Sequence, residues 1–291
     1  MTEGLARLKP APLPAIHPVP EYLADEALTA VYADTKSVLQ VPWMGVVTMA
    51  FAHYPAFFRT LWSGLRELAG SREFVEACDD LRAFAEAAAS GLGPEPVTPA
   101  LTEIGYAERE IEDIRALNEV FSHGNMPYLL IATAARLLLE DRPLNERTSV
   151  TPYEGRHGPS SANRLLLMEA HHVDAATAAV YESIKSTLGL PFVNTDYRAF
   201  ARWPSYLARS WRGLSETVPT TTYETQVAAV HDFAVERMLM LPNPGKLTPE
   251  RLQQATTEDE SFEEIRDVVR LFQWLLPGLV TNVAFFRAQL T

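Results

Sequence analysis

A carboxylate stands on an otherwise apolar face in the segment that follows Pro191. In a helix beginning there, Asp196 shares one broad face with Phe192 and Phe200. An unpaired buried carboxylate is costly, so Asp196 must be hydrogen-bonded, hydrated or shifted towards its neutral form. Such a carboxylate can cap or cross-link helices, and it can equally accept a proton from water. Asp196 is therefore our first candidate for a general base.

A second polar residue interrupts an apolar face in the segment 108–140. The helical spacing i, i+4, i+7 places Asn118 on the face formed by Ile114 and Phe121. An amide beside a carboxylate suits water activation, because the carboxylate takes a proton while the amide fixes the water's other hydrogen bonds. We predict Asp196 and Asn118 as the catalytic residues.

Other reactive residue types have simpler structural explanations. The group Glu169, His171, His172 and Asp174 resembles a metal site, but adjacent histidines on a helix point in different directions. Cys78 follows Phe74 at helical spacing and is expected to be a packing residue. The chain has no glycine-rich phosphate loop, serine nucleophile elbow or dinucleotide fingerprint. We therefore predict neither a metal nor a cofactor.

The two polar residues are exceptions within an internal repeat. Residues 32–65 align with 181–214 without a gap at a constant offset of 149, with 12 identities in 34 positions. In this repeat Asp196 corresponds to Val47, and at an offset of 151 Asn118 corresponds to Val269. Two copies of one packing unit share their core requirements, so each polar residue marks a break in the symmetry. If the halves pack about a pseudo-twofold axis, the two breaks can converge on one cavity between them.

The hydrophobic periodicity predicts an all-α protein. We expect helices over 22–39, 43–53, 56–69, 71–90, 108–140, 174–188, 192–202, 205–217, 222–240 and 262–289, the fifth interrupted near 124–127. Loops are expected at 91–99 and 242–245. The predicted organisation is an extended proline-rich arm (1–20), a first helical repeat (21–140), a linker (141–161) and a second repeat (162–291). The tandem repeats are expected to pack as a pseudo-dimer with the site between them.

The composition limits the cellular compartment in which we expect the protein and the classes of partner that it can bind. The chain of 291 residues has one cysteine, no apolar leader and no run of eighteen apolar residues, so we expect a cytoplasmic protein that does not span a membrane. Its formal net charge of −12 argues against nucleic acid and anionic membrane surfaces as partners. An anionic substrate would need local donors to overcome this unfavourable field.

Two segments carry a family resemblance. The sequence VPWMGV at 41–46 and the sequence PFVNTDYRAFARWP at 191–204 resemble the group I 2-haloacid dehalogenases, an all-helical and duplicated family. The likeness covers nearly the whole chain. It implies hydrolytic removal of halide from C2 of a short 2-haloalkanoic acid, which gives the 2-hydroxy acid with inversion. It also implies that Asp196 activates a water that attacks carbon directly, without an enzyme ester, and that Asn118 helps to hold this water.

The same resemblance suggests how a small anionic 2-haloacid is held. Backbone N–H groups at the start of the helix that contains Asn194 and Thr195 would bind the carboxylate. Trp43, Val46 and Phe192 would line the apolar part of the site. The D-specific members of the family are similar to this sequence in having asparagine at the position of Asn194, so we expect a preference for D-2-haloacids.

Two other functions remain open at this point. A non-catalytic helical module on the same scaffold would bind small carboxylic acids without releasing halide. A related hydrolase would act on another activated short acid, because fold resemblance does not define a substrate. A binder of anions would more readily place Arg or Lys on the core face than Asp196, which favours catalysis. The resemblance further suggests a homodimer.

Overall fold

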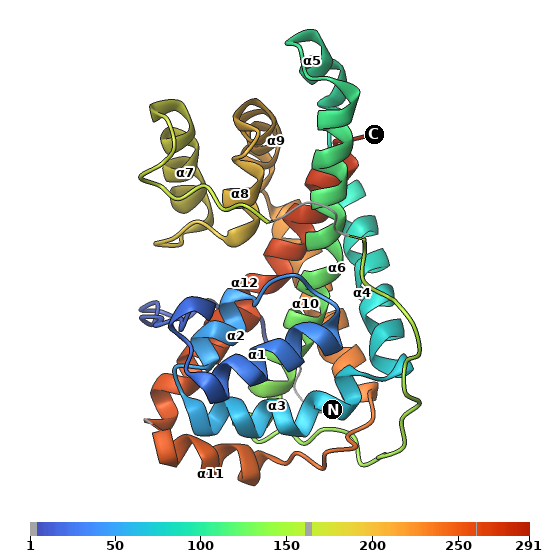
Figure 1. Ribbon diagram of the computed structural model, residues 1–291, viewed down its shortest axis with the longest axis vertical. Helices are drawn as coiled ribbons and strands as arrows, with labels where there is room; N and C mark the ends of the chain where they lie inside the picture. The colour runs from blue at the N-terminus through green and yellow to red at the C-terminus, as the bar shows by residue number, and fades with distance from the viewer. Residues whose placement is uncertain (1–4, 161–164, 260) are drawn as a thin grey trace.

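The computed structural model describes residues 5–160, 165–259 and 261–291, and these contain helices and connecting segments without a β-strand (Figure 1). The first half holds a 3-10 turn (Glu21–Leu23), α1 (Glu26–Leu39), α2 (Val46–Phe51), α3 (Pro55–Ala69), α4 (Arg72–Ser90), α5 (Thr98–Glu103) and α6 (Glu108–Leu139). The second half holds α7 (Ala175–Leu188), α8 (Thr195–Phe200), α9 (Pro204–Thr217), α10 (Thr221–Met240), α11 (Pro249–Asp259) and α12 (Phe262–Ala288). The predicted all-α class is confirmed.

The same local signals begin equivalent helices in the two halves. The side chains of Asp25 and Asp174 each accept a first-turn backbone N–H at 2.8 Å, which caps α1 and α7. Pro55 and Pro204 occupy the first turns of α3 and α9, where a helix needs no N–H donor. The repeat seen in the sequence is therefore a repeat of helix starts and of element order.

Equivalent hydrogen bonds extend the repeat into the segments before the first helix of each half. The Val19 N–H donates to the Met49 carbonyl at 3.0 Å, and 149 residues later the Met168 N–H donates to the Arg198 carbonyl at 3.0 Å. The Tyr32 hydroxyl donates to the Val19 carbonyl, and its counterpart Tyr181 donates to that of Met168. The extended arm and the segment before α7 are thus corresponding parts of the two copies.

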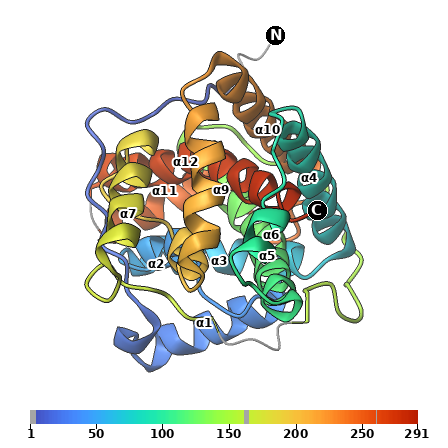
Figure 2. The same ribbon diagram turned by 90° about the horizontal axis from the view of Figure 1, so that it is seen from above.

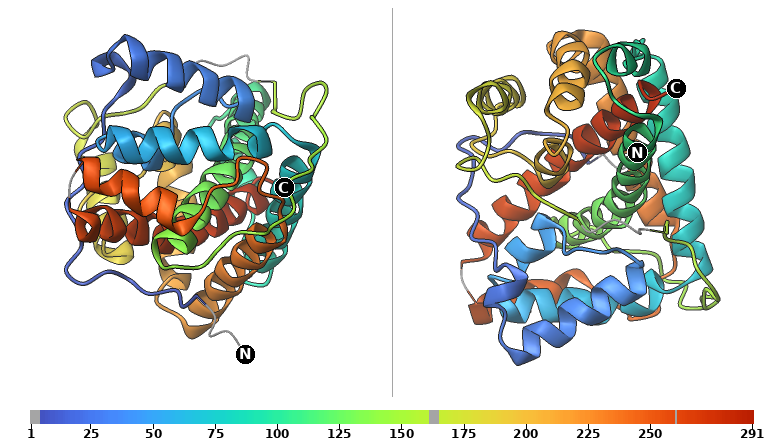
Figure 3. Two further views of the ribbon diagram at one scale, coloured as in Figure 1. Left: turned by 90° about the horizontal axis from the view of Figure 1, so that it is seen from below. Right: turned by 45° about the horizontal axis from the view of Figure 1, so that its top comes forward.

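The halves exchange elements instead of lying side by side. The long helices α6 and α12 pack against each other in the centre, with α4 and α10 beside them (Figures 1 and 2). Helix α11 of the second half packs on α3 of the first, which Figure 3 shows from below. Helix α5 of the first half lies at the same end of the molecule as α7, α8 and α9. Each end of the molecule is therefore built from both repeats.

The expected interruption of the 108–140 helix near 124–127 is wrong, because α6 continues through Pro127. A proline inside a helix removes one donor, and packing of a long helix on its neighbours can offset that loss. Gly124 serves close packing, since a Cβ there would lie 2.3 Å from Cη2 of Trp43. Helices α5 and α11 were not among the helices expected from the periodicity.

The segments outside the helices differ in length from the expected ones. Residues 5–20 form an extended arm, in agreement with the proline-rich composition, and residues 1–4 lie outside the described part. Between α6 and α7 the described residues contain no helix up to Asp174, beyond the expected end of the linker at 161. The boundaries assigned to the two repeats stay predictions.

Helix α12 is a core helix. Among the described helices it alone is long and apolar enough to cross a membrane, but 89% of its apolar stretch is buried inside the protein. Residues of α6 and α12, which pack against each other, line the site described next.

Candidate functional site

A small cavity lies between the repeats, where α2 and α8 begin and face the middle of α6 and α12. Its volume is about 30 Å³, which is room for roughly two water molecules. Trp43 and Phe272 line it with aromatic rings. The predicted location of the site between the halves agrees with this geometry.

Most residues around the cavity form pairs related by the internal repeat, and each pair has one polar and one apolar or side-chain-free member. The pairs are Asp196 and Val47, Thr195 and Val46, Asn194 and Gly45, Asn125 and Leu276, and Tyr128 and Leu279. The polar members lie on α6 and at the start of α8, whereas the others lie on α12 and at the start of α2. One cavity at the centre of the repeat therefore has a polar side and an apolar side.

Asp196 is the ionisable group of this cavity. Its side chain is buried, and Asn125 Nδ2 donates a hydrogen bond to its Oδ1 at 2.7 Å. Burial raises the pKa of Asp196 to about 6, although the Asn125 hydrogen bond and the charge of Arg198 oppose that rise. At neutral pH the group is mostly ionised and yet more basic than an exposed carboxylate. These are the properties of a general base that works near neutral pH.

The amide partner of Asp196 is Asn125 and not Asn118. Asn118 is buried, and its Nδ2 donates to the Val283 carbonyl at 3.3 Å. It lies seven residues before Asn125 on α6, about 10 Å along the axis, and it does not line the cavity. The expected convergence of Asn118 with Asp196 is therefore corrected: the amide comes from the same helix of the same repeat, two turns further on.

A sequence signal for Asn125 was present. At the offset of 151 that relates α6 to α12, Asn125 corresponds to Leu276, which is the same kind of polar exception as Asn118 against Val269. A break at 124–127 would place Asn125 in a loop, where a polar side chain is not an exception to an apolar helical face. Because α6 is continuous, that face extends to Asn125 and onward to Tyr128.

The predicted substrate-binding residues divide between two places. Trp43, Val46, Asn194 and Thr195 line the cavity with Asp196. Trp43 is held there through its backbone, since its carbonyl accepts a 2.7 Å hydrogen bond from the Tyr128 hydroxyl. Phe192 does not line this cavity. It lies in a separate groove between α7 and the proline-rich arm, so its expected place in the site is corrected.

The remaining candidates have structural roles. Glu169 pairs with Arg198 at 2.8 Å, and Asp174 caps α7. Among the described residues no group of three or more His, Cys, Asp or Glu side chains is arranged to hold a metal ion. His123, a partly buried histidine of α6 that does not line the cavity, has a ring nitrogen 3.3 Å from the Leu39 carbonyl, and burial lowers its pKa. Cys78 is buried, and burial raises the pKa of its thiol.

Known proteins with similar sequences share one activity in their names. No protein-family model matches the chain. A protein of Rhizobium sp. (strain NHG3) called (R)-2-haloacid dehalogenase is 43% identical over 244 residues, which cover 84% of this chain and 95% of the relative. A Pseudomonas putida protein of the same name is 36% identical over 278 residues, 94% of this chain and 92% of that one. A configuration-inverting 2-haloacid dehalogenase of Pseudomonas sp. (strain 113) is 25% identical over 255 residues, 82% of each chain.

Solved structures agree with the sequence comparison. The crystal structure of a D-2-haloacid dehalogenase mutant superimposes with a TM-score of 0.88 at 34% identity, over 99% of this chain and 100% of that one. The complex of such a mutant with D-2-CPA gives a TM-score of 0.88 at 33% identity, with the same coverage. The all-α fold is thus that of a D-2-haloacid dehalogenase. The chain belongs to the D-specific, or (R)-2-haloacid, dehalogenase family.

Proposed function

We propose that the protein hydrolyses short D-2-haloalkanoic acids to the 2-hydroxy acids with inversion at C2. The observation that carries this proposal is the division of one cavity into a polar side with a single carboxylate, Asp196, and an apolar side without an ionisable group. A displacement at carbon needs a directed nucleophile on one face and room for a halogen on the other. The relatives named (R)-2-haloacid dehalogenase support the same reaction.

In the proposed reaction Asp196 acts on water and not on carbon. Its Oδ1 is occupied by the hydrogen bond from Asn125, so Oδ2 is the oxygen that takes a proton from the water. As the proton moves to Asp196, the water oxygen forms its bond to C2, and the carbon–halogen bond breaks with its electron pair going to the departing halide. Asn125 fixes the direction of the carboxylate and keeps it ionised.

The substrate carboxylate would be received where α2 and α8 begin. Neither Gly45 nor Asn194, the residues before these helices, caps its helix with a side-chain hydrogen bond. First-turn N–H groups are therefore left for a ligand. The halogen and the alkyl group would lie against Leu276 and Leu279 on the apolar side. A cavity of about 30 Å³ must enlarge to hold them.

The preference for the D enantiomer rests on Asn194. Its counterpart Gly45 has no side chain, and a Cβ there would lie 2.8 Å from the Tyr128 ring. The counterpart of Tyr128 is the smaller Leu279, so α8 has room for an asparagine where α2 does not. The Asn194 side chain fills volume on one side of C2. Halide release from D- and L-2-chloropropionate, measured separately, should be much faster for D; equal rates would refute the role of Asn194.

Replacement of the base tests the mechanism. Asp196→Asn should abolish halide release while the circular dichroism spectrum is unchanged, and near-normal turnover would show that Asp196 is not the base. A single turnover in ¹⁸O-labelled water distinguishes direct attack from an ester. We expect label in the hydroxy acid alone, whereas label in the Asp196 carboxylate would mean an ester intermediate.

A non-catalytic binder of small carboxylic acids is the alternative from another class of protein. It predicts saturable binding of 2-haloacids with no halide released by the wild-type chain. A hydrolase of another activated short acid would instead show higher turnover on that substrate. The homodimer and the cytoplasmic location stay predictions, which light scattering and cell fractionation would test.

A further inference from the structure

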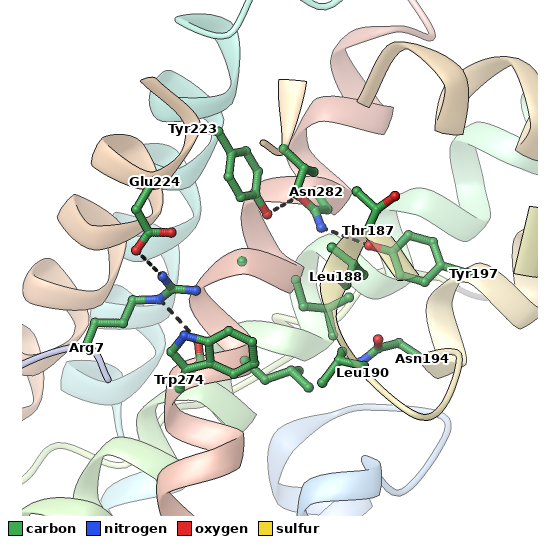
Figure 4. Close-up of a pocket in the computed structure, with 14 residues that line it drawn as sticks. Arg7, Thr187, Leu188, Leu190, Asn194, Tyr197, Tyr223, Glu224, Trp274 and Asn282 are labelled. Carbon is green, nitrogen blue, oxygen red and sulfur yellow. Dashed lines mark hydrogen bonds and ion pairs between the residues drawn. The ribbon is translucent and has the colours of Figure 1, made fainter. Parts of the chain in front are cut away.

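A second and larger cavity adjoins the catalytic one. Its volume is about 180 Å³, against about 30 Å³ for the catalytic cavity. The segment from α7 to α8, helices α10 and α12 and the N-terminal arm surround it (Figure 4). Asn194, Leu275 and Leu279 line both cavities and so form the partition between them. We call the larger space the antechamber, because these three side chains separate it from the cavity that Asp196 lines.

A largely buried cation from the N-terminal arm lies in the antechamber. The Arg7 side chain is 9% exposed. Its Nη1 donates to Glu224 at 2.5 Å, and its Nε donates to the Trp274 carbonyl at 3.2 Å (Figure 4). No described residue accepts a hydrogen bond from Nη2, which lies 3.8 Å from the place that a Cβ on Gly278 would take. One edge of the guanidinium is therefore directed at the cavity with its donors available.

Further donors come from a chain of polar side chains beside Arg7. The Tyr223 hydroxyl donates to Asn282 Oδ1 at 2.9 Å, and Asn282 Nδ2 donates to the Tyr197 hydroxyl at 2.9 Å (Figure 4). All three side chains line the antechamber. Within the described part of the chain, the second N–H of Asn282 and the hydroxyl hydrogen of Tyr197 have no acceptor. The wall thus offers hydrogen-bond donors, as an anion requires.

The first repeat lacks these two tyrosines and this asparagine, although it has the same helices. The positions of Tyr197, Tyr223 and Asn282 correspond to Thr48, Phe74 and Ile131, which are buried. Arg7 corresponds at an offset of 149 to Arg156. That residue instead donates to carbonyls of its own segment, at Gly158 and Pro159. The fold does not need the polar lining, because the corresponding region of the first repeat is built without it.

We infer that the antechamber is a separate binding site for a small carboxylate, in which Arg7 holds the substrate anion before it passes Asn194 into the catalytic cavity. This inference rests on the proposed function for the identity of the anion. The protein has a net charge of −12, which repels an approaching carboxylate. A buried guanidinium offsets that repulsion at one place and can donate a charge-assisted hydrogen bond to a carboxylate. Glu224 keeps Nη1, and the ligand takes Nη2.

The experiment compares an anion with its uncharged isostere. Propionate and propionamide are titrated calorimetrically into wild type, Arg7→Gln, Arg7→Lys and Lys9→Gln. Lys9 is the matched control, because it lies on the same arm, packs 4.9 Å from the centre of the same Trp274 ring and does not line the antechamber. We expect Arg7→Gln to weaken propionate binding about tenfold and to change propionamide binding by less than about twofold. Lys9→Gln should change the binding of either ligand by less than about twofold. Arg7→Lys should restore part of the loss.

A gain of affinity separates ligand binding from a structural role. Glu224→Gln removes the competing carboxylate, so it should tighten propionate binding about threefold, an effect that loss of an arm contact would not produce. The kcat/KM for D-2-chloropropionate should fall with Arg7→Gln while kcat changes little. Unchanged propionate binding in Arg7→Gln, or equal losses for propionate and propionamide, would overturn the inference. If wild type binds propionate through Arg7 but releases no halide from 2-haloacids, the proposed reaction is wrong and the carboxylate site stands.

Discussion

The raised pKa of Asp196 makes a quantitative prediction about stability. Folding raises this pKa from 3.8 to about 6, chiefly through burial. The charged form is therefore disfavoured in the folded protein by about 3 kcal/mol. Below pH 3.8 the carboxyl group is protonated in both states and costs nothing. The penalty develops as the pH rises through the window from 3.8 to about 6, and it is complete above that.

Asp196→Asn removes the ionisation and keeps an oxygen that can accept the Asn125 hydrogen bond. At pH 7.5 the variant should be more stable to unfolding than wild type by about 3 kcal/mol, which is roughly 5 °C in Tm for a chain of this length. Near pH 4 the difference should fall below about 1 kcal/mol. Urea titrations followed by tryptophan fluorescence at the two pH values measure the difference, and halide release is assayed on the same samples.

Asp174→Asn is the control for this measurement. Hydrogen bonds from the Thr177 backbone lower the pKa of the exposed Asp174 carboxyl, so its contribution has the opposite sign and is lost as the pH falls. Asparagine also caps helices well, so Asp174→Asn should change the free energy of unfolding only slightly. Two outcomes would refute the claim that ionisation of Asp196 destabilises the folded protein. One is that Asp196→Asn is no more stable than wild type at pH 7.5, and the other is that it is more stable by the same amount at pH 4.

Three further predictions concern the site. The kcat/KM of wild type should fall tenfold per pH unit below about pH 6, because protonated Asp196 cannot take a proton from water; an acid limb near pH 4 would contradict the effect of burial. Asn125→Ala should lower kcat about a hundredfold and move the acid limb to higher pH, since it removes a hydrogen bond that lowers the Asp196 pKa. Asn118→Ala should leave the limb in place, and equal pH profiles for the two variants would restore Asn118 to the site. Gly124→Ala should cost about 1–3 kcal/mol in urea unfolding, because its Cβ would meet the Trp43 ring; an unchanged midpoint would show that the ring can move.

The sequence was sufficient for most of the helices, for the repeat and for the choice of Asp196 as a candidate. Helical periodicity is a property of neighbouring residues, and the comparison of copies needs only an alignment, so Asp196 against Val47 could be recognised without coordinates. The same holds for Asn194 and Thr195, which adjoin Asp196 at the start of α8. These features depend on local order along the chain.

The partner of Asp196 and the antechamber depended on packing. Whether Gly124 and Pro127 interrupt α6 depends on how the surrounding helices pack against it. Because α6 is continuous, the amide that contacts Asp196 is that of Asn125 and not that of Asn118. Phe192 was misplaced for a related reason: it precedes α8, so its side chain need not follow the face of Asp196. Arg7 and Tyr223 are 216 residues apart, and no periodicity relates an extended arm to a helix that distant.

The exchange of helices between the halves bears on why the two copies are joined in one chain. Asp196 and Val47 occupy corresponding places around a single central cavity. A dimer of two identical half-length chains would by symmetry place the same residue at both, and two aspartates in so small a space would repel each other. One of them would have to hold a proton, and the halogen would lose its apolar wall. Covalent fusion lets one copy mutate to valine while the other keeps its carboxylate. The duplicated chain can thus evolve an asymmetric centre that a symmetric assembly could not encode.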